Sequence, residues 1–599
     1  MRKLLAFLLS LTLLVTALPA LAYTAGTYTA SAQGNNGPVE VSVTFDGDKI
    51  TGVAVTNHSE TAGIAEAPIE KIPAAIVAGQ TLKVDAISGA TMTSNAILAA
   101  VADCVQQAGG DVEALKATEA SAAVAEDEEI TYDVVVLGGG AAGLAAAAEA
   151  ADAGASVVLL EKLSRLGGNT LISGGLVYAT GTSFQKEAGV EDSAEALVEY
   201  WQTRAEGNAD PAFLTLVAEK SGETINWLTE NGVALTGPTT SGTSTVPRMQ
   251  SAGGGSGLVL PLTKAVEDRG VKIYTDTAAQ TLLTDETGAV IGVEALAADG
   301  HKVTAYATRG VVIATGGFDV SEEMKAKYAP SIAGSYSYSS PGNVGDGINM
   351  AIAVGADTVF KDGAIGFRGI REVFSFASPL DGQIWSPYLY VDAKGSRFVN
   401  EAIDYPIFHS AMLKNGSDHF FLIYDAATAN PEVLDAAVTE GYAFQADSIE
   451  ALAEAAGMDA ATFSATVSRY NELAGKEDAD FGKPAALMTG IGDGPYYALK
   501  VVPATIGSMG GVKADLSAQV LNAEGAAIPG LYAAGAVANG DFFYKEYPAS
   551  GTSIQMCLTM GRIAGASAAA RTKKSEPAGK GLAYREASDH QQKRPALSG

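Results

Sequence analysis

The glycine-rich stretch that ends at Gly143 has the spacing of a turn that binds a dinucleotide phosphate. It follows an apolar run and reads Gly138-Gly139-Gly140-Ala141-Ala142-Gly143. Gly138 permits a tight turn, Gly140 lets the backbone approach a pyrophosphate, and Gly143 lets a helix pack closely on a strand. The N-terminus of that helix would direct its partial positive charge at the phosphates. Glu161 ends the next predicted strand, where a carboxylate can accept hydrogen bonds from ribose hydroxyls.

A second candidate group is the hydroxyl of Thr91, the last residue of the run Ser88-Gly89-Ala90-Thr91. The small residues before it leave room for a bulky phosphoester. A helix predicted from residue 94 onward would direct its N-terminal dipole at the phosphate. Thr93 carries the next-best hydroxyl for a phosphoester. The alternative interpretation is that this run is only an ordinary capped start of a helix.

Hydrophobic patterning predicts the elements that must position these residues. Around the glycine turn the chain predicts a strand, a helix and a strand over residues 132–137, 142–153 and 156–160. This βαβ unit is typical of the start of a doubly wound α/β fold. Around Thr91 it predicts a hairpin over 39–55, followed by helices over 68–78 and 94–107.

Length and composition place the chain among globular proteins of several domains. It has 599 residues, of which 47% are apolar and 18% are charged, which predicts two to four domains. The net charge of −29 argues against nucleic acid or an anionic membrane surface as a partner. Only Cys104 and Cys557 are present, without a C-x-x-C-H run, so neither covalent haem nor a disulfide framework is expected. No metal site is predicted.

The first residues have the pattern of a secretory signal peptide. Arg2-Lys3 precedes an apolar run, and Ala20-Leu21-Ala22 offers a small-residue cleavage site before Tyr23. The alternative, a membrane anchor, needs about 20 apolar residues and stop-transfer charges. We therefore expect residues 1–22 to be removed and the protein to be exported, at the cell surface, in the periplasm or outside the cell.

Two motifs resemble known flavin-binding families. Ser88-Gly89-Ala90-Thr91, with Asp85 upstream, resembles the attachment motif of FMN-binding domains, in which a flavin transferase esterifies FMN to the last threonine. The glycine turn at 138–143 resembles the FAD fingerprint of the fumarate reductase and succinate dehydrogenase flavoprotein family. The resemblances imply covalent FMN on Thr91, non-covalent FAD, and a flavin transferase as a maturation partner.

The second resemblance also implies a set of FAD contacts, drawn from the glycine turn and from later motifs of the same family. One departure is Ala536, which stands where the family usually has a glutamate. The expected contacts are Gly138, Gly140, Ala142, Gly143, Glu161, Lys162, Gly168, Asn169, Thr170, Gly174, Gly175, Gly316, Asp346, Gly535, Ser553 and Ile554.

The fold expected from these resemblances is α/β. It consists of a doubly wound FAD-binding domain with an inserted α+β capping domain, preceded by a small α+β FMN-binding domain. The FMN-binding domain is expected over 23–107, the FAD-binding domain over 131–357 and 506–571, and the mobile capping domain over 358–505. Residues 108–130, rich in Ala and Glu, are interpreted as a linker, with a helix packed on a domain as the alternative. Residues 572–599 are expected to be a disordered tail.

The residues at the expected substrate site differ from those of fumarate reductases. That family uses an arginine proton donor after an Arg-Phe-x-Asn-Glu run, and a histidine and an arginine that hold carboxylates. Here the run is present at 397–401, but the three positions fall on Tyr405, near Gly507 and near Pro548. Burying a dicarboxylate without those cations costs several kcal/mol. Fumarate is therefore not the expected substrate.

Tyr547-Pro548-Ala549-Ser550-Gly551 resembles a run of the 3-ketosteroid dehydrogenases, another branch of the superfamily. There the tyrosine hydroxyl and the glycine N–H polarise a ketone oxygen, which stabilises the negative charge that develops on it. Tyr405 matches that family's proton-transfer tyrosine. The resemblance implies Tyr405, Tyr547, Gly551 and Arg397 as the catalytic set, with Arg397 fixing loop geometry. A core tyrosine at Tyr405 and a turn anchor at Tyr547 are the alternatives.

The function expected is reduction of an activated C=C bond conjugated to a carbonyl, in an enone or ketosteroid-like substrate. Electrons would pass from FMN to FAD, and they would come from a membrane or extracellular donor. One alternative is an acrylate-type reductase acting on urocanate, a cinnamate or a fumarate-like acid, with Arg368 or Arg371 as the anion clamp. Another is a flavin electron carrier without an organic substrate.

Overall fold

The structure is a computed structural model that describes residues 23–87, 90–118, 125–370 and 378–574. The chain divides into an N-terminal unit, residues 1–123, and a C-terminal unit, residues 124–599. The predicted signal peptide, Arg371 and residues 575–599 of the predicted tail lie outside the described residues. None of the helices in the described ranges is long and apolar enough to cross a membrane.

The N-terminal unit is a three-stranded antiparallel sheet covered by helices. In β2, Val39, Val41, Val43 and Phe45 are buried while the residues between them are not, so one face of the sheet forms the core. α3 falls in the predicted linker, yet Leu115 is buried in the same core, so this helix belongs to the unit. The elements are β1 (Gly26–Gln33), β2 (Pro38–Phe45), β3 (Ile50–Asn57), α1 (Glu66–Gly79), α2 (Thr91–Gln107) and α3 (Val112–Ala117).

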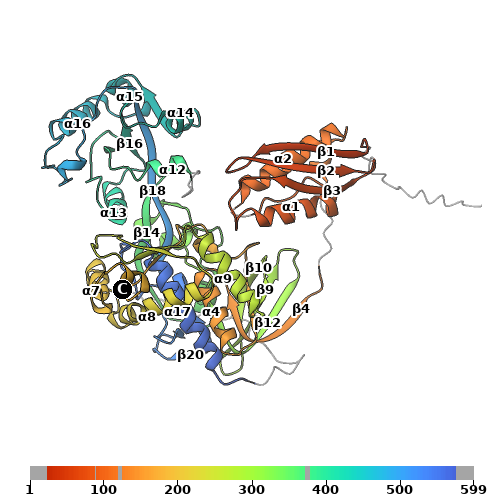
Figure 1. The fold of residues 1–599 in the computed structure, drawn as a ribbon. Helices are drawn as coiled ribbons and strands as arrows, with labels where there is room; N and C mark the ends of the chain where they lie inside the picture. Colours follow the sequence, from red (N-terminus) through yellow and green to blue (C-terminus); the bar gives the residue numbers. More distant parts are fainter. Residues whose placement is uncertain (1–22, 88–89, 119–124, 371–377, 575–599) are drawn as a thin grey trace, which may run out of the picture. The chain divides into compact units, whose positions relative to one another are not determined.

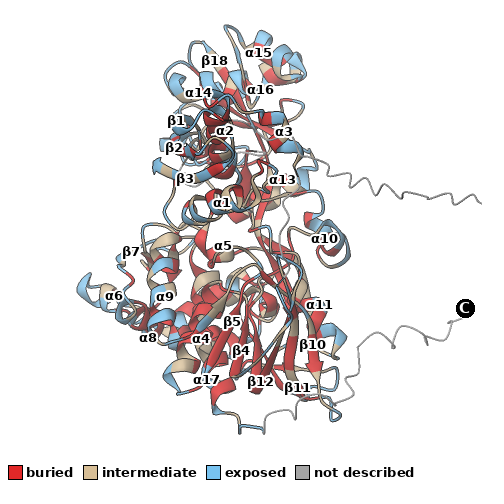
Figure 2. Cartoon of the chain, turned by 90° about the vertical axis from the view of Figure 1, so that its right-hand side faces the viewer, coloured by how far each residue is buried: buried red, intermediate tan, exposed pale blue. Residues whose placement is uncertain are grey.

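The C-terminal unit is built on an eight-stranded sheet with the order β10-β11-β12-β4-β5-β9, in which β20 also pairs with β12 and β19 with β20. The central strands run parallel and are buried, as Figure 2 shows for β4, β5 and β12. A parallel sheet covered on both faces requires such apolar strands. The strands are β4 (Glu128–Leu137), β5 (Val157–Leu160), β9 (Lys272–Tyr274), β10 (Thr277–Thr284), β11 (Val290–Ala297), β12 (Lys302–Ile313), β19 (Gln519–Leu521) and β20 (Ala527–Ala533).

Helices α4 and α17 pack against each other beside this sheet. A side chain at Gly561 or Gly565 would collide with the backbone of α4 at Ala142 or Ala146, so these glycines allow the close approach. The remaining elements here are α4 (Ala141–Asp152), α5 (Gly168–Leu171), β6 (Leu176–Tyr178), α6 (Ser183–Glu187), α7 (Ala194–Arg204), α8 (Pro211–Glu230), β7 (Thr236–Thr239), β8 (Met249–Ser251), α9 (Ser256–Asp268), α10 (Glu322–Tyr328), η1 (Pro330–Ile332), β13 (Tyr336–Ser337), α11 (Asp346–Ala353), η3 (Gly535–Ala538) and α17 (Thr552–Ala570).

We call residues 358–505 the cap, and the rest of the C-terminal unit, which is built on the eight-stranded sheet, the sheet part. The cap leaves and rejoins the sheet part through two long antiparallel strands, β14 and β18 (Figure 1). Within the cap, β16 is buried on both faces: Phe420 and Leu422 pack in one cluster with α13 and α14, and Phe421 and Ile423 in another with α15 and α16. The elements are β14 (Thr358–Gly369), α12 (Pro379–Gln383), β15 (Tyr390–Asp392), α13 (Tyr405–Asn415), β16 (Phe420–Tyr424), α14 (Pro431–Thr439), β17 (Ala443–Ala446), α15 (Ile449–Ala456), α16 (Ala460–Glu472), η2 (Ala485–Leu487) and β18 (Tyr496–Val512).

Candidate active site

A cavity of about 490 Å³ opens at the carboxyl ends of β4, β5 and β12. This is the edge at which open α/β sheets bind their ligands. The N-termini of α4 and α17 reach the cavity, and cap residues close its other end. One end is therefore built from the glycine turn and the strand ends, and the other from the cap and the loop before α17.

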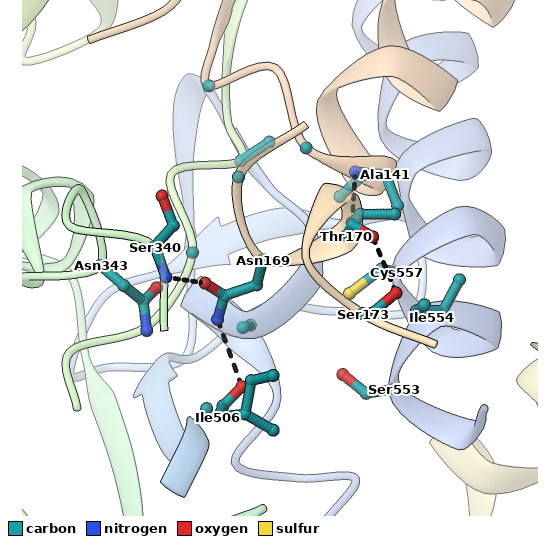
Figure 3. A pocket seen from close by; sticks show the side chains of 18 of the residues that line it. Ala141, Asn169, Thr170, Ser173, Ser340, Asn343, Ile506, Ser553, Ile554 and Cys557 are labelled. Carbon is teal, nitrogen blue, oxygen red and sulfur yellow. Dashed lines mark hydrogen bonds between the residues drawn. The ribbon is translucent and has the colours of Figure 1, made fainter. Parts of the chain in front are cut away.

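The glycine turn holds the backbone open at the first end. Gly138 has φ of 97°, a conformation that side chains rarely adopt, and a Cβ there would collide with the Ala314 carbonyl. The Ala141 N–H at the start of α4 donates to Thr170 Oγ1 at 3.1 Å (Figure 3). The N-terminus of α4 thus lines the cavity, where it suits a pyrophosphate.

Glu161 is fixed beside this turn by two backbone amides. Its carboxylate accepts from Gly139 N–H at 2.7 Å and from Leu163 N–H at 2.8 Å. Burial raises the pKa of Glu161, and the two N–H groups oppose that rise. Lys162, the next residue, pairs with Asp346 at 2.8 Å on the cavity lining.

Asn169, on the cavity lining, bridges the loop at Ser340 and strand β18. Its amide oxygen accepts from Ser340 N–H at 2.6 Å, and its amide nitrogen donates to the Ile506 carbonyl at 3.2 Å (Figure 3). On the same lining, Asn343 Oδ1 accepts from Gly317 N–H at 2.6 Å. Ile554 and Cys557 project into the cavity from one face of α17.

Two tyrosines meet at the second end of the cavity. The Tyr547 hydroxyl accepts from Ser553 N–H at 2.8 Å, and the Tyr405 hydroxyl accepts from Ser550 Oγ at 3.3 Å. Because both oxygens accept, both phenolic protons are left to be donated. Gly551 lies between these partners with φ of 91°, and a Cβ there would meet the Tyr178 backbone nitrogen at 2.9 Å.

Both tyrosines stay neutral over a wide pH range. Burial, and after it the neighbouring Tyr547 hydroxyl, raise the pKa of Tyr405 well above its usual value. Burial also raises the pKa of Tyr547, against the opposing N–H groups at the start of α17. Neutral phenols can donate a hydrogen bond without bringing charge into the cavity, and a phenol that gives its proton to a developing anion leaves the net charge of the site unchanged.

The other walls of this end are aromatic and aliphatic. Trp385 packs edge-on against Tyr405 with ring centroids 5.9 Å apart and stacks on Phe367 at 6.3 Å. Ile365 and Ile506 complete the wall. Among the described lining residues the only cationic side chain is Lys162, which is paired with Asp346. This end therefore combines apolar, largely aromatic walls with the hydroxyls of Tyr405 and Tyr547.

In the N-terminal unit, the two candidate FMN acceptors differ in accessibility. Thr91 is exposed at the first position of α2, a helix whose N-cap residue Ala90 makes no side-chain cap hydrogen bond. Thr93 is 2% exposed, and its hydroxyl donates to the Glu60 carboxylate. Thr91 is therefore the hydroxyl that an FMN phosphate can reach, next to amides that suit an anion.

Comparison with known proteins identifies both units. A family model described as FAD binding domain matches residues 133–554, and one described as FMN-binding domain matches residues 34–106. The chain belongs to the FAD-binding family of fumarate reductase-type flavoproteins. The chain therefore has one domain for FMN and one for FAD. The shape and the donor groups of the cavity in the second domain fit FAD. Bound FAD, once reduced, would supply a hydride.

The flavoprotein is similar to proteins that reduce activated double bonds. It is 33% identical to the NADH:acrylate oxidoreductase of Vibrio harveyi over 91% of this chain and 61% of that protein. It is 32% identical to the urocanate reductase of Eggerthella lenta over 91% of this chain and 92% of that protein. Among solved structures, the 3-ketosteroid-Δ4-(5α)-dehydrogenase of Rhodococcus jostii is similar with a TM-score of 0.60 and 30% identity, over 75% of this chain and 99% of that one.

Most of the residues predicted to contact FAD line the cavity of the flavoprotein. Gly143, Gly175 and Gly535 are not among the described lining residues, and a Cβ on each would meet a neighbouring backbone or side chain. Ala536, which stands where the family usually has a glutamate, also lines the cavity. The residues that do line it are Gly138, Gly140, Ala142, Glu161, Lys162, Gly168, Asn169, Thr170, Gly174, Gly316, Asp346, Ser553 and Ile554.

The sequence reasoning missed several lining residues. Asn343 stands two residues before the Gly345-Asp346-Gly347 run, a signal that could have found it. Phe367 and Trp385 lie in the cap, where no local pattern marks the direction of a side chain.

Arg397 lies outside the cavity lining and is held in a buried cluster of charges. It pairs with Glu401 at 2.8 Å and with Asp478 at 2.7 Å, and Lys483 also pairs with Glu401 at 3.2 Å. The guanidinium therefore fixes the loop before α13, which carries Tyr405. This geometry supports positioning rather than contact with substrate.

Arg368 is likewise absent from the described lining. Its guanidinium is 4% exposed and lies 4.2 Å from the Phe408 ring centroid and 5.8 Å from that of Trp385. Nε donates to the Ile384 carbonyl, whereas Nη1 has no hydrogen-bond partner among the described residues. Trp385, which lines the cavity, is thus one of the aromatic rings around this cation.

Proposed function

We propose that this flavoprotein reduces a carbon–carbon double bond conjugated to a neutral carbonyl group. The observation that carries the proposal is the pair Tyr405 and Tyr547, which face a cavity end without a free cation among the described lining residues. A carboxylate buried there would lack a compensating charge, at a cost of several kcal/mol. An enone needs only hydrogen-bond donors.

The side chains divide the chemistry between them. The Tyr547 hydroxyl and the Gly551 N–H hold the carbonyl oxygen and stabilise the negative charge that develops on it when hydride adds to the β carbon. The Tyr405 hydroxyl gives its proton to the α carbon and regains one from solvent. The double bond thus gains two electrons and two protons in all, and Phe367 and Trp385 line this end of the cavity.

We propose further that the protein works outside the cytoplasm. The basic and apolar residues before Tyr23 support export, and FMN on Thr91 implies a flavin transferase. Electrons enter through FMN from a membrane or extracellular donor. A fusion of residues 1–30 to a reporter enzyme that is active only after export tests the localisation; activity retained only in the cytoplasm would contradict it.

The test of the reaction is anaerobic reoxidation of the reduced protein, followed by flavin absorbance. We expect neutral enones, including 3-ketosteroids, to reoxidise it quickly, and fumarate, urocanate and cinnamates slowly. Tyr547→Phe should lower the limiting rate about 100-fold, as for loss of one oxyanion donor. Tyr424→Phe, a buried cap tyrosine bonded to Gln383, is the matched control and should leave the rate unchanged.

A second candidate is an acrylate-type reductase, favoured by the unpartnered Nη1 of the buried Arg368. This function requires Trp385 to move aside so that a carboxylate reaches the guanidinium. Reoxidation by carboxylates alone, abolished by Arg368→Ala and unaffected by Tyr547→Phe, would select it and reject the enone proposal. No reoxidation by any substrate would favour an electron carrier.

A further inference from the structure

Arg204, the last residue of α7, lies between the two segments that carry the proposed catalytic tyrosines. Its Nη2 is 3.7 Å from Asp404 Oδ2 and 3.5 Å from Glu546 Oε2. The same nitrogen donates to the Tyr547 carbonyl at 3.4 Å. The side chain is 11% exposed, so these contacts are shielded from solvent.

The two carboxylates have matching places in the sequence. Asp404 directly precedes Tyr405 and caps α13 in the cap, while Glu546 directly precedes Tyr547 in the sheet part. A single guanidinium therefore contacts the residue before each tyrosine, across the boundary between the cap and the sheet part. One turn earlier in α7, Tyr200 donates to the Pro548 carbonyl at 2.6 Å and holds the same loop.

No other group described in the structure can replace Arg204 in this role. It is the only cation among the described residues that forms an ion pair with Asp404 or Glu546. Asp404 is largely buried, and its Oδ2 has no hydrogen-bond partner in the described part of the chain. Removing one partner of a buried ion pair leaves an uncompensated charge, which destabilises the arrangement around it.

We propose that Arg204 is a positioning residue that sets the distance and orientation between the hydroxyls of Tyr405 and Tyr547. The proposal rests on the proposed function, because it assigns those two hydroxyls to proton donation and to holding the carbonyl. Loss of the guanidinium leaves both tyrosine side chains present but displaces one hydroxyl relative to the other. A displacement of about 1 Å can slow a positioned reaction about 100-fold.

The experiment compares Arg204→Gln and Arg204→Lys with Arg562→Gln in the full chain carrying both flavins. Arg562 is a matched control, because it also bridges two carboxylates, Glu149 at 2.5 Å and Glu223 at 3.2 Å, and is 16% exposed. Reoxidation by a neutral enone gives the limiting rate, the half-saturating concentration and the solvent isotope effect.

We expect Arg204→Gln to lower the limiting rate about 10- to 100-fold and to raise the solvent isotope effect, with little change in half-saturation. Arg204→Lys, which keeps the charge, should recover part of the rate. Arg562→Gln should stay within about twofold of the unaltered protein. If Arg204→Gln does not retain both flavins, Glu546→Gln, whose side chain is 30% exposed, should show a smaller loss of the same kind.

Two outcomes would overturn the inference. In the first, Tyr405→Phe and Tyr547→Phe are slow whereas Arg204→Gln and Glu546→Gln keep the limiting rate and the isotope effect. In the second, the loss in Arg204→Gln follows its FAD content alone, and lysine gives no recovery. If instead both tyrosine variants react at the normal rate, the proposed function fails, and the role of Arg204 fails with it.

Discussion

The hydroxyl of Tyr547 accepts a hydrogen bond from the first turn of α17, and that of Tyr405 accepts one from Ser550. A phenol that accepts in this way keeps its own proton for a ligand. Raised pKa values hold both groups protonated, so their donor role persists at neutral and mildly alkaline pH. In the proposed function, these two protons hold the carbonyl oxygen and protonate the substrate.

The difference between Thr91 and Thr93 gives a direct test of FMN attachment. Thr91→Ala, produced together with a flavin transferase, should lack the covalent flavin seen by mass spectrometry and keep the FAD that acid releases. Thr93→Ser should retain the covalent flavin, because the serine hydroxyl still donates to Glu60. Covalent flavin persisting in Thr91→Ala would move the attachment to another residue.

The FAD end of the cavity could be predicted from the sequence because its signals are local. The spacing of Gly138, Gly140 and Glu161 is set within one βαβ unit, so a short stretch contains the geometry. The contacts of Arg204 with Asp404 and Glu546 could not be predicted, since they join segments about 200 and 340 residues apart in the chain. Nor could the sequence place Trp385 against Tyr405, because side-chain directions in the cap depend on its packing.

At the scale of the element, the N-cap of α13 is Asp404, whose carboxyl group is largely buried. Burial raises the pKa of Asp404 to about 6; Arg204 and the Tyr405 N–H oppose the rise, and Glu546 adds to it. An unfolded aspartate titrates near pH 4, so the folded state binds more protons between about pH 4 and 6. The contribution of Asp404 to stability is therefore greatest below pH 4 and is lost as the pH rises through 6.

Asp404→Asn removes this titration and keeps an N-cap side chain. The unaltered protein should lose about 3 kcal/mol more stability than this variant between pH 4 and pH 7. Urea unfolding at several pH values measures the difference, with Glu546→Gln as the control that still titrates at Asp404. Parallel curves for the unaltered protein and Asp404→Asn would contradict the assignment.

At the scale of the whole molecule, the charge of −29 sets how reductants approach. Repulsion between like charges is screened by salt over a Debye length of about 10 Å at 0.1 M. The rate of flavin reduction by dithionite, an anion, should rise about two- to tenfold between low and high salt. Reduction by the methyl viologen radical cation should slow over the same range, and stopped-flow absorbance follows both.

The opposite signs of the two salt effects separate electrostatics from a general effect of salt on the protein. If both reductants respond in the same direction, the surface charge does not control electron entry. A physiological donor would then be recognised through local contacts instead of through the overall field.

The β14–β18 ribbon divides the proposed active site between two stretches of sequence that can change independently. The residues that define flavin binding lie before residue 358 and after residue 505, whereas Tyr405, Phe367 and Trp385 lie in the stretch between them. An evolutionary change of substrate can therefore take place in the insert while the flavin fingerprint stays as it is. For this reason the fingerprint identifies the family of such a chain, whereas its substrate has to be inferred from the insert together with Tyr547 and Gly551 in the loop before α17.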